Sequence, residues 1–233
     1  MTRHILPFLV IALFSVSNAF AHYLWVTVDS SGKTNIYFEG GPGPGDGKYL
    51  DPFIERGKSW FRTANDPKPK ELELQVTKKP GKRWLSAELP KGGDRAIEMY
   101  GKWGVFRYGN TDVLLHYYGR HLNVSSNESL KKLSSATHLD LDIVLTPTND
   151  GLRLQVLWKG KPAAGRSVNL RGPGLNKNLK TDDKGTASFK PEKSGRYTLR
   201  TSVEEDRVGK DDGKDFQKVR HHCTLTVNLP VSD

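Results

Sequence analysis

Apolar and polar side chains alternate with a period of two along much of the chain. The alternation is clearest in residues 139–145, 152–158 and 197–203, where most alternate residues are apolar. This period is typical of strands that bury one face. Turn-forming clusters separate the segments at 148–151, 159–162, 182–185 and 193–195. Regularly spaced short strands of this kind predict an immunoglobulin-like or transthyretin-like β-sandwich over residues 138–229.

Residues 22–137 also carry strand patterns, although less regularly. The predicted strands are 23–28, 35–39, 72–76, 103–108 and 113–118, and short helices are predicted at 51–61 and 126–132. We therefore expect an all-β protein with an N-terminal β domain (22–137), a C-terminal β-sandwich (138–229) and a tail (230–233). We expect the two units to pack as one body, with the first strand close to the last.

The first 21 residues do not follow this pattern. A basic start at Arg3-His4 is followed by an apolar run at 5–16 and by the ending Ala19-Phe20-Ala21. This order is typical of a cleavable secretory signal, and the run is shorter than the roughly 20 residues that span a bilayer. We predict that residues 1–21 are a signal peptide and that the mature, periplasmic or secreted chain begins at His22. An uncleaved anchor is the alternative. With no second long apolar run, no membrane span is expected in the mature chain.

The composition limits the kinds of partner that we expect and indicates how the fold is stabilised. The 233 residues include 36 Lys and Arg against 26 Asp and Glu, a net charge of +10. The basic residues are spread along the chain, so we expect no nucleic-acid partner and at most weak attraction to anionic polymers. The single cysteine, Cys223, excludes an intramolecular disulfide. A hydrophobic core must therefore stabilise the fold, and Cys223 is expected to be a small buried member of it.

Part of the C-terminal unit resembles the sandwich module shared by carboxypeptidase-regulatory and collagen-adhesin B-type domains. The matching segments are Lys159-Gly-Lys-Pro-Ala-Ala-Gly-Arg-Ser-Val168, Thr181-Asp-Asp-Lys-Gly185 and Gly195-Arg-Tyr-Thr-Leu199. The resemblance implies a fold. It implies little about function, because such sandwiches serve many roles.

A wider resemblance covers most of the mature chain. It rests on the start Ala21-His-Tyr-Leu-Trp25, on Tyr117-Tyr118 and on the closing segment 209–221. These features resemble the NikM-like family, a bacterial group related to the periplasmic component of nickel and cobalt uptake systems. The resemblance implies a metal cargo and a membrane transporter component as a partner. Some members carry a C-terminal transmembrane helix, and this sequence has no apolar run of that kind.

His22 is the first candidate metal ligand. Cleavage after Ala21 would give His22 a free α-amine, and the amine and imidazole of one residue can chelate a single ion. Nitrogen donors of these types suit copper, nickel, cobalt and zinc. Such a site needs a further histidine, and we predict His221, with His222 and His116 as weaker candidates. The alternative for His221 is a buried structural histidine, because it shares a strand face with apolar residues.

The glycine-rich segment 39–47 has two interpretations. It is either a plain surface loop or the rim of a site that carries Glu39 and Asp46. Its glycines allow positive φ and close backbone approach. It is not a phosphate-binding loop, because the Gly-Lys-Ser/Thr ending is absent.

The motifs of known enzymes are missing, so we do not expect an enzyme. The sequence has no nucleophile elbow, no zinc-protease motif and no evident pair of catalytic carboxylates. The leading hypothesis is an extracytoplasmic transition-metal-binding protein for uptake, buffering or delivery of nickel, cobalt or copper, with His22 and His221 as ligands. The alternatives are a structural or adhesive envelope module that binds a protein or polysaccharide without metal, and a copper oxidoreductase.

Overall fold

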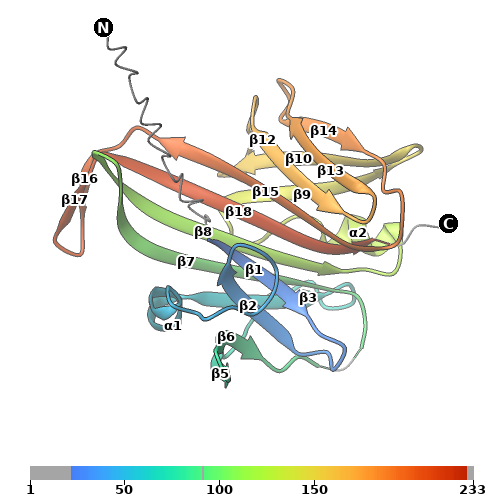
Figure 1. Ribbon diagram of the computed structural model, residues 1–233. Helices are drawn as coiled ribbons and strands as arrows, with labels where there is room; N and C mark the ends of the chain where they lie inside the picture. The colour runs from blue at the N-terminus through green and yellow to red at the C-terminus, as the bar shows by residue number, and fades with distance from the viewer. Residues whose placement is uncertain (1–21, 91, 230–233) are drawn as a thin grey trace, which may run out of the picture.

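The computed structural model describes residues 22–90 and 92–229 (Figure 1). The predicted signal peptide and tail lie outside these residues. The predicted all-β class is confirmed, since strands dominate and the only helices described are two short ones, α1 (Asp51–Arg56) and α2 (Asn127–Leu133). None of the described helices is long and apolar enough to cross a membrane.

A twisted sheet of eight strands forms the centre of the molecule. In spatial order the strands are β13 (Leu175–Lys180), β12 (Ser167–Gly172), β15 (Gly195–Glu205), β18 (Lys218–Leu229), β8 (Thr111–Asn123), β7 (Arg95–Tyr108), β3 (Lys58–Thr63) and β4 (Lys70–Glu71). Within it β18 and β8 run parallel, whereas the other neighbours are antiparallel. The sheet takes strands from both sides of the predicted boundary at 137/138.

Two smaller sheets cover opposite faces of the central sheet (Figure 1). The lower one is formed by β1 (Tyr23–Val28), β2 (Thr34–Glu39), β6 (Lys82–Ala87) and β5 (Gln75–Lys79). The upper one is formed by β9 (Leu141–Thr148), β10 (Gly151–Trp158), β11 (Lys161–Pro162) and β14 (Thr186–Phe189). Each encloses its own buried apolar cluster. The upper sheet packs against the central sheet as the second layer of a β-sandwich.

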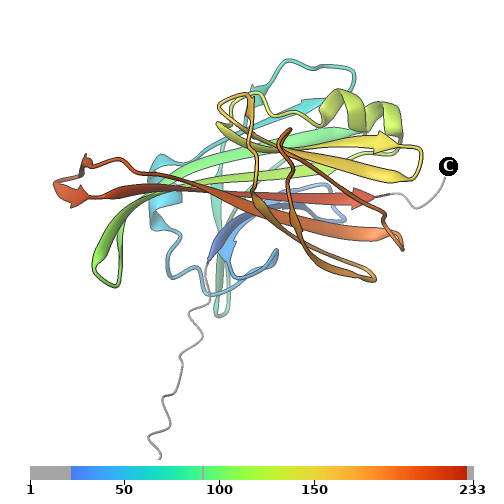
Figure 2. The ribbon, with the colours of Figure 1, turned by 90° about the horizontal axis from the view of Figure 1, so that it is seen from above.

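The long central strands extend past the upper sheet, as Figure 2 shows. At this end lie the turn between β7 and β8 and a small hairpin made of β16 (Gly209–Asp211) and β17 (Lys214–Phe216). A register shift between Lys102 and Gly104 marks the same end of β7. Residues 209–216, the first part of the closing segment 209–221, therefore form a projecting hairpin.

The two faces of β8 and β18 alternate residue by residue. What we call the sandwich face carries His116, Tyr118 and Arg120 of β8 and His221, Cys223 and Leu225 of β18, and it packs against β9 and β10. What we call the β1 face carries Tyr117 and His121 of β8 and His222, Thr224 and Thr226 of β18. The hydroxyls of Thr224 and Thr226 donate to the backbone carbonyls of Leu24 and Val26. The first strand thus crosses the last as predicted, through side chains.

Two predicted elements differ from the structure. The helix predicted at 51–61 ends at Arg56, because Gly57 turns extended and the aromatic segment of β3 then pairs with β7. The strand predicted at 72–76 begins only at Gln75. Leu72 is nevertheless buried, and its N–H donates to the Ser59 carbonyl, so its apolar character reflects core packing outside a strand.

Candidate functional site

His22 lies immediately before β1, at the edge of the lower sheet. Its ring packs edge-on against Tyr49, with centroids 5.2 Å apart, and is tilted against Phe38 at 5.7 Å. The His22 Nε2 atom lies 3.9 Å from Oε2 of Glu39, and 27% and 17% of the two side chains are exposed. Hairpin pairing produces this arrangement, because Tyr23 stands opposite Glu39 in the register. An imidazole nitrogen and a carboxylate therefore face each other where solvent reaches both.

The glycine-rich loop after β2 folds over the Glu39 carboxylate. The N–H of Gly47 donates to Glu39 Oε1 at 3.2 Å. Gly45 passes so close that an added Cβ would lie 2.2 Å from the Glu39 carboxyl carbon, so a side chain at this position would displace the carboxylate. Asp46 is exposed and accepts a hydrogen bond from the Lys48 N–H in its own turn. Of the two carboxylates predicted on the rim, Glu39 is the one that faces His22.

His221 lies on the sandwich face within a group of ring side chains. The parallel pairing of β18 and β8 places it opposite His116, and the two rings stack with centroids 5.0 Å apart. The His221 Nδ1 atom is 3.1 Å from the Tyr118 hydroxyl, and Nε2 is 2.9 Å from Glu205 Oε1. The Trp158 ring covers the group, with its centroid 4.3 Å from that of His221. Both ring nitrogens of His221 are thus engaged within the fold.

Burial sets the charges in this group. Burial, with a smaller effect of the neighbouring His221, lowers the pKa of His116 to about 4. Burial also lowers the pKa of His221, against the opposing effect of Glu205. Burial alone would raise the pKa of Glu205, but hydrogen bonds with His221 and Lys159 outweigh it and lower that pKa. The His116 Nδ1 bonds a tyrosine hydroxyl, while its buried Nε2 has no hydrogen-bond partner among the described residues.

The neighbours of His221 on β18 lie in closed surroundings. His222, on the β1 face, stacks on Tyr117 at 5.0 Å and meets Tyr23 edge-on at 5.4 Å. Burial lowers the pKa of His222 to about 3. Cys223 is fully buried, as expected, and burial raises the pKa of its thiol. Cys223 is inaccessible to a metal ion from solvent without local opening, whereas His222 is half-buried.

The structure does not bring His22 and His221 together. His22 lies on the β1 side of the central sheet, whereas His221 lies on the sandwich face. Across residues 22–90 and 92–229, no group of three or more His, Cys, Asp and Glu side chains is arranged to hold a metal ion. The pair that the structure does bring together on the exposed side is His22 with Glu39.

The sequence analysis named Glu39 but did not place it beside His22. The signal was available, because the turn at 29–33 fixes the β1–β2 register, and counting outwards from it pairs Tyr23 with Glu39. The contact between His221 and Glu205 carried no comparable signal. The connection from β15 to β18 contains the β16–β17 hairpin, so no single tight turn fixes their register.

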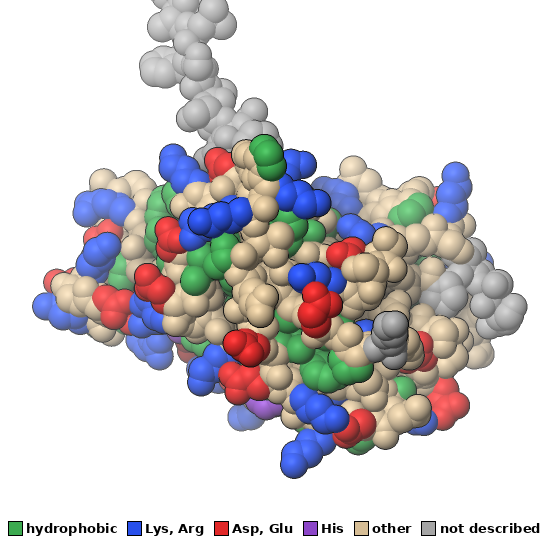
Figure 3. All heavy atoms as spheres, turned by 90° about the horizontal axis from the view of Figure 1, so that it is seen from below, with side chains coloured by type: hydrophobic (Ala, Val, Ile, Leu, Met, Phe, Trp, Pro, Cys, Tyr) green, Lys and Arg blue, Asp and Glu red, His purple; other side chains and the backbone are tan. Residues whose placement is uncertain are grey.

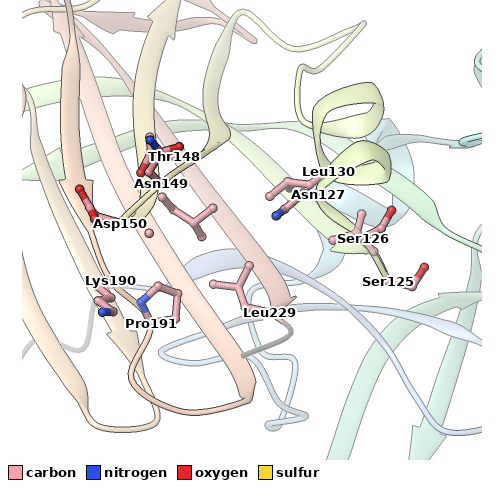
Figure 4. A pocket seen from close by; sticks show the side chains of 13 residues that line it. Ser125, Ser126, Asn127, Leu130, Thr148, Asn149, Asp150, Lys190, Pro191 and Leu229 are labelled. Atoms are coloured by element: carbon pink, nitrogen blue, oxygen red, sulfur yellow. The ribbon is translucent and has the colours of Figure 1, made fainter. Parts of the chain in front are cut away.

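A wider hollow of about 550 Å³ lies between α2 and the β9–β10 turn (Figure 4). Its charged and polar lining includes Ser125, Ser126, Asn127, Asp150 and Lys190. Neither histidine nor cysteine lines this hollow. Its polar groups are mainly oxygen atoms and one ammonium group, so it lacks the imidazole and thiolate ligands that transition metals prefer.

Comparison with models of protein families and with curated proteins finds no match to this chain. The resemblance to the NikM-like family therefore stays a prediction that rests on the residues quoted above.

Proposed function

We propose that the protein is an extracytoplasmic transition-metal-binding protein and that His22 and Glu39 hold the metal ion. The observation that carries the proposal is the 3.9 Å approach of His22 Nε2 to Glu39 Oε2 at a partly exposed edge. Imidazole suits copper, nickel, cobalt and zinc, and a carboxylate supplies an anionic oxygen ligand. Removal of residues 1–21 would add the α-amine of His22 as a third donor on the same residue.

The surroundings of the pair support ligand exchange. The Gly47 N–H holds one carboxylate oxygen of Glu39, which leaves the other directed towards His22. Such a contact orients a ligand, as outer-shell hydrogen bonds do in metal sites. The pair is open enough for an ion to reach, and small adjustments would bring both atoms to one ion. Because amine and imidazole must be unprotonated to bind, affinity should fall as pH falls.

His221 is a poorer candidate in this geometry. A metal ion at its Nε2 would displace Glu205, and one at its Nδ1 would displace the Tyr118 hydroxyl. Leaving the buried Tyr118 hydroxyl unpaired costs roughly 1–3 kcal/mol. We therefore assign His221 a structural role, and we assign the protein a role in uptake, buffering or delivery of nickel, cobalt or copper. The NikM-like resemblance supports a membrane transporter component as its partner.

Calorimetric titration with Ni(II), Co(II), Cu(II) and Zn(II) tests the proposal on a chain that starts at His22. We expect His22→Ala to lower the affinity for the preferred metal about 100-fold or more, and Glu39→Gln to lower it about tenfold. His221→Ala is the control and should change the affinity less than about threefold, since it lies across the sheet. A wild-type chain that binds none of these ions more tightly than about micromolar would refute the metal function.

The role of the α-amine and of export can be tested separately. Intact-mass measurement of the exported protein should give a chain that begins at His22. A chain that keeps Ala21 or carries an acetylated His22 amine should bind the metal at least about tenfold more weakly, because one donor is lost. Equal binding by free and acetylated chains would leave Glu39 and the ring as ligands and exclude the amine.

A further inference from the structure

A narrow groove lies on the other side of the glycine-rich loop from His22. The loop and Trp25 form one wall, and strands β12 and β15 form the floor. The groove has a volume of about 270 Å³ and is lined by Trp25, Gly40, Gly41, Pro42, Asn169, Arg171, Thr198 and Arg200. We call it the arginine groove. Its lining contains two arginines and no carboxylate.

A third arginine stands at the end of this groove. Arg196 is two residues before Thr198 on β15, and its Nη1 donates to the Pro42 carbonyl at 3.4 Å. Arg171 pairs with Thr198 in the register, so Arg196 and Arg200 are its diagonal neighbours, with Cα atoms about 7–8 Å away. The three arginines therefore belong to one face of the sheet, beside the groove. Each arginine is partly or fully exposed.

No opposite charge balances this group. Within the described parts of the chain, no carboxylate lies within salt-bridge distance of Arg171, Arg196 or Arg200, whereas Arg220 on the neighbouring strand pairs with Glu204 at 2.6 Å. Arg171 donates to the carbonyls of residues 170 and 177, which orient the guanidinium and leave its charge in place. Arg200 lies over the Tyr23 ring, 4.5 Å from its centroid. Three positive charges on one small area of surface, without a carboxylate beside them, favour an anion.

The remaining lining favours an anionic sugar. Asn169 and Thr198 offer an amide and a hydroxyl that suit sugar hydroxyls, and the indole of Trp25 gives a rigid apolar wall. The volume lies just below the range of small-ligand pockets and suits about one sugar ring. Guanidinium forks match the oxygens of sulfate and carboxylate groups.

The surface charge argues against a nucleic-acid ligand. A phosphate backbone requires a row or stripe of basic residues. On the face of the molecule shown in Figure 3, Lys and Arg side chains alternate with Asp and Glu and form no such stripe. A compact cluster at one groove fits a charged group that recurs at intervals along a polymer. We infer that the arginine groove binds an acidic polysaccharide through the sulfate or carboxylate group of one sugar unit.

Binding measured by fluorescence anisotropy at about 0.15 M salt, where surface charge is largely screened beyond about 8 Å, tests this inference. The probes are labelled dextran sulfate, polygalacturonate, neutral dextran and a single-stranded oligonucleotide of similar charge. We expect binding to one or both acidic polysaccharides, and the stronger of the two identifies the charged group. Neutral dextran should not bind, and the oligonucleotide should bind at least about tenfold more weakly than the preferred polysaccharide.

A pair of charge-matched double variants locates the site. Arg171→Gln with Arg200→Gln should weaken binding about tenfold or more. Arg153→Gln with Arg166→Gln removes the same charge from residues outside the groove and should weaken binding less than about threefold. Circular dichroism and thermal melting of both double variants establish that they fold. Equal losses in the two, tighter binding of the oligonucleotide, or no binding of either acidic polysaccharide would overturn the inference.

Discussion

The two sides of the central sheet hold histidine in different ways. On the sandwich face, His221 and His116 stack beneath Trp158, with their charges suppressed by burial. On the β1 side, His22 lies at a sheet edge with more than a quarter of its side chain exposed and the Glu39 carboxylate nearby. In the first arrangement, both ring nitrogens of His221 are bonded within the fold. The second places donor atoms together where an ion from solvent can reach them.

This difference bears on how a histidine is judged as a metal ligand. A motif or a strand position cannot distinguish the two cases, because both residues lie in or beside strands with aromatic neighbours. Exposure distinguishes them, because 27% of the His22 side chain and 5% of the His221 side chain are exposed. An ion must displace whatever the ring already bonds, and inside a fold that displaced group is left unpaired.

The largest effect is expected from breaking the polar support of the sandwich face. Arg120 is fully buried, and its Nη1 donates to Asp142 Oδ1 at 2.6 Å, while Nη2 donates to the Leu133 carbonyl at the end of α2. Arg120→Leu leaves a buried carboxylate unpaired, so we expect a loss of about 3–5 kcal/mol in the free energy of unfolding. Urea denaturation measures it.

The control for this substitution is Arg153→Leu, at an exposed position on β10, which should change stability by less than about 0.5 kcal/mol. A loss below about 1 kcal/mol for Arg120→Leu would show that the buried pair is dispensable and would weaken the contrast between the two sides. Metal affinity of the folded Arg120→Leu protein should stay that of the wild type.

The next effect concerns the loop over Glu39. Gly45→Ala forces a Cβ into the space of the Glu39 carboxyl group, so the carboxylate must move away from its Gly47 contact. We expect metal affinity to fall about tenfold, the size of effect seen when a ligand's supporting contact is lost. Gly43→Ala is the matched control, because nothing lies within 4 Å of its added Cβ. If both variants bind equally, Glu39 is not a ligand.

The last effect concerns pH. Folded His116 has a pKa of about 4, whereas an unfolded histidine titrates near about 6.5. Between these values the unfolded state binds more protons, so the free energy of unfolding falls as pH is lowered. His121 and His222, both with a pKa lowered to about 3, act in the same direction. Chemical denaturation from pH 7 to pH 4.5 should show this loss of stability.

The His116→Gln variant tests how much of this pH dependence comes from His116. His116→Gln keeps a side chain that can bond the Tyr100 hydroxyl, which bonds His116 Nδ1 at 2.9 Å. The variant should lose about 2 kcal/mol less than the wild type over the same pH range. An unchanged pH dependence would mean that His116 is not held neutral by the sandwich face.

Local pattern alone was sufficient for much of the fold. Alternation predicted the all-β class and most strands of the C-terminal half, because a strand's two faces repeat every two residues and one face is buried. The aromatic start gave β1, which runs over Tyr23–Val28 as predicted. The apolar face of the last strand, which includes Leu225, also gave the burial of Cys223. The helix at 51–61 was predicted too long, because pairing of β3 with β7 overrides the local preference.

Only the tertiary structure decided which chemical groups meet. The parallel pairing of β18 with β8 brings His221 to His116 across nearly half of the chain. The same register sends His222 to the opposite face, because neighbouring strand residues point in opposite directions. The pairing that brings His22 to Glu39 is local, because it follows from the register of one hairpin. The exposure of the two side chains depends on how the lower sheet packs on the central sheet. Local periodicity indicates which residues are buried, whereas long-range strand pairing decides which residues they pack against.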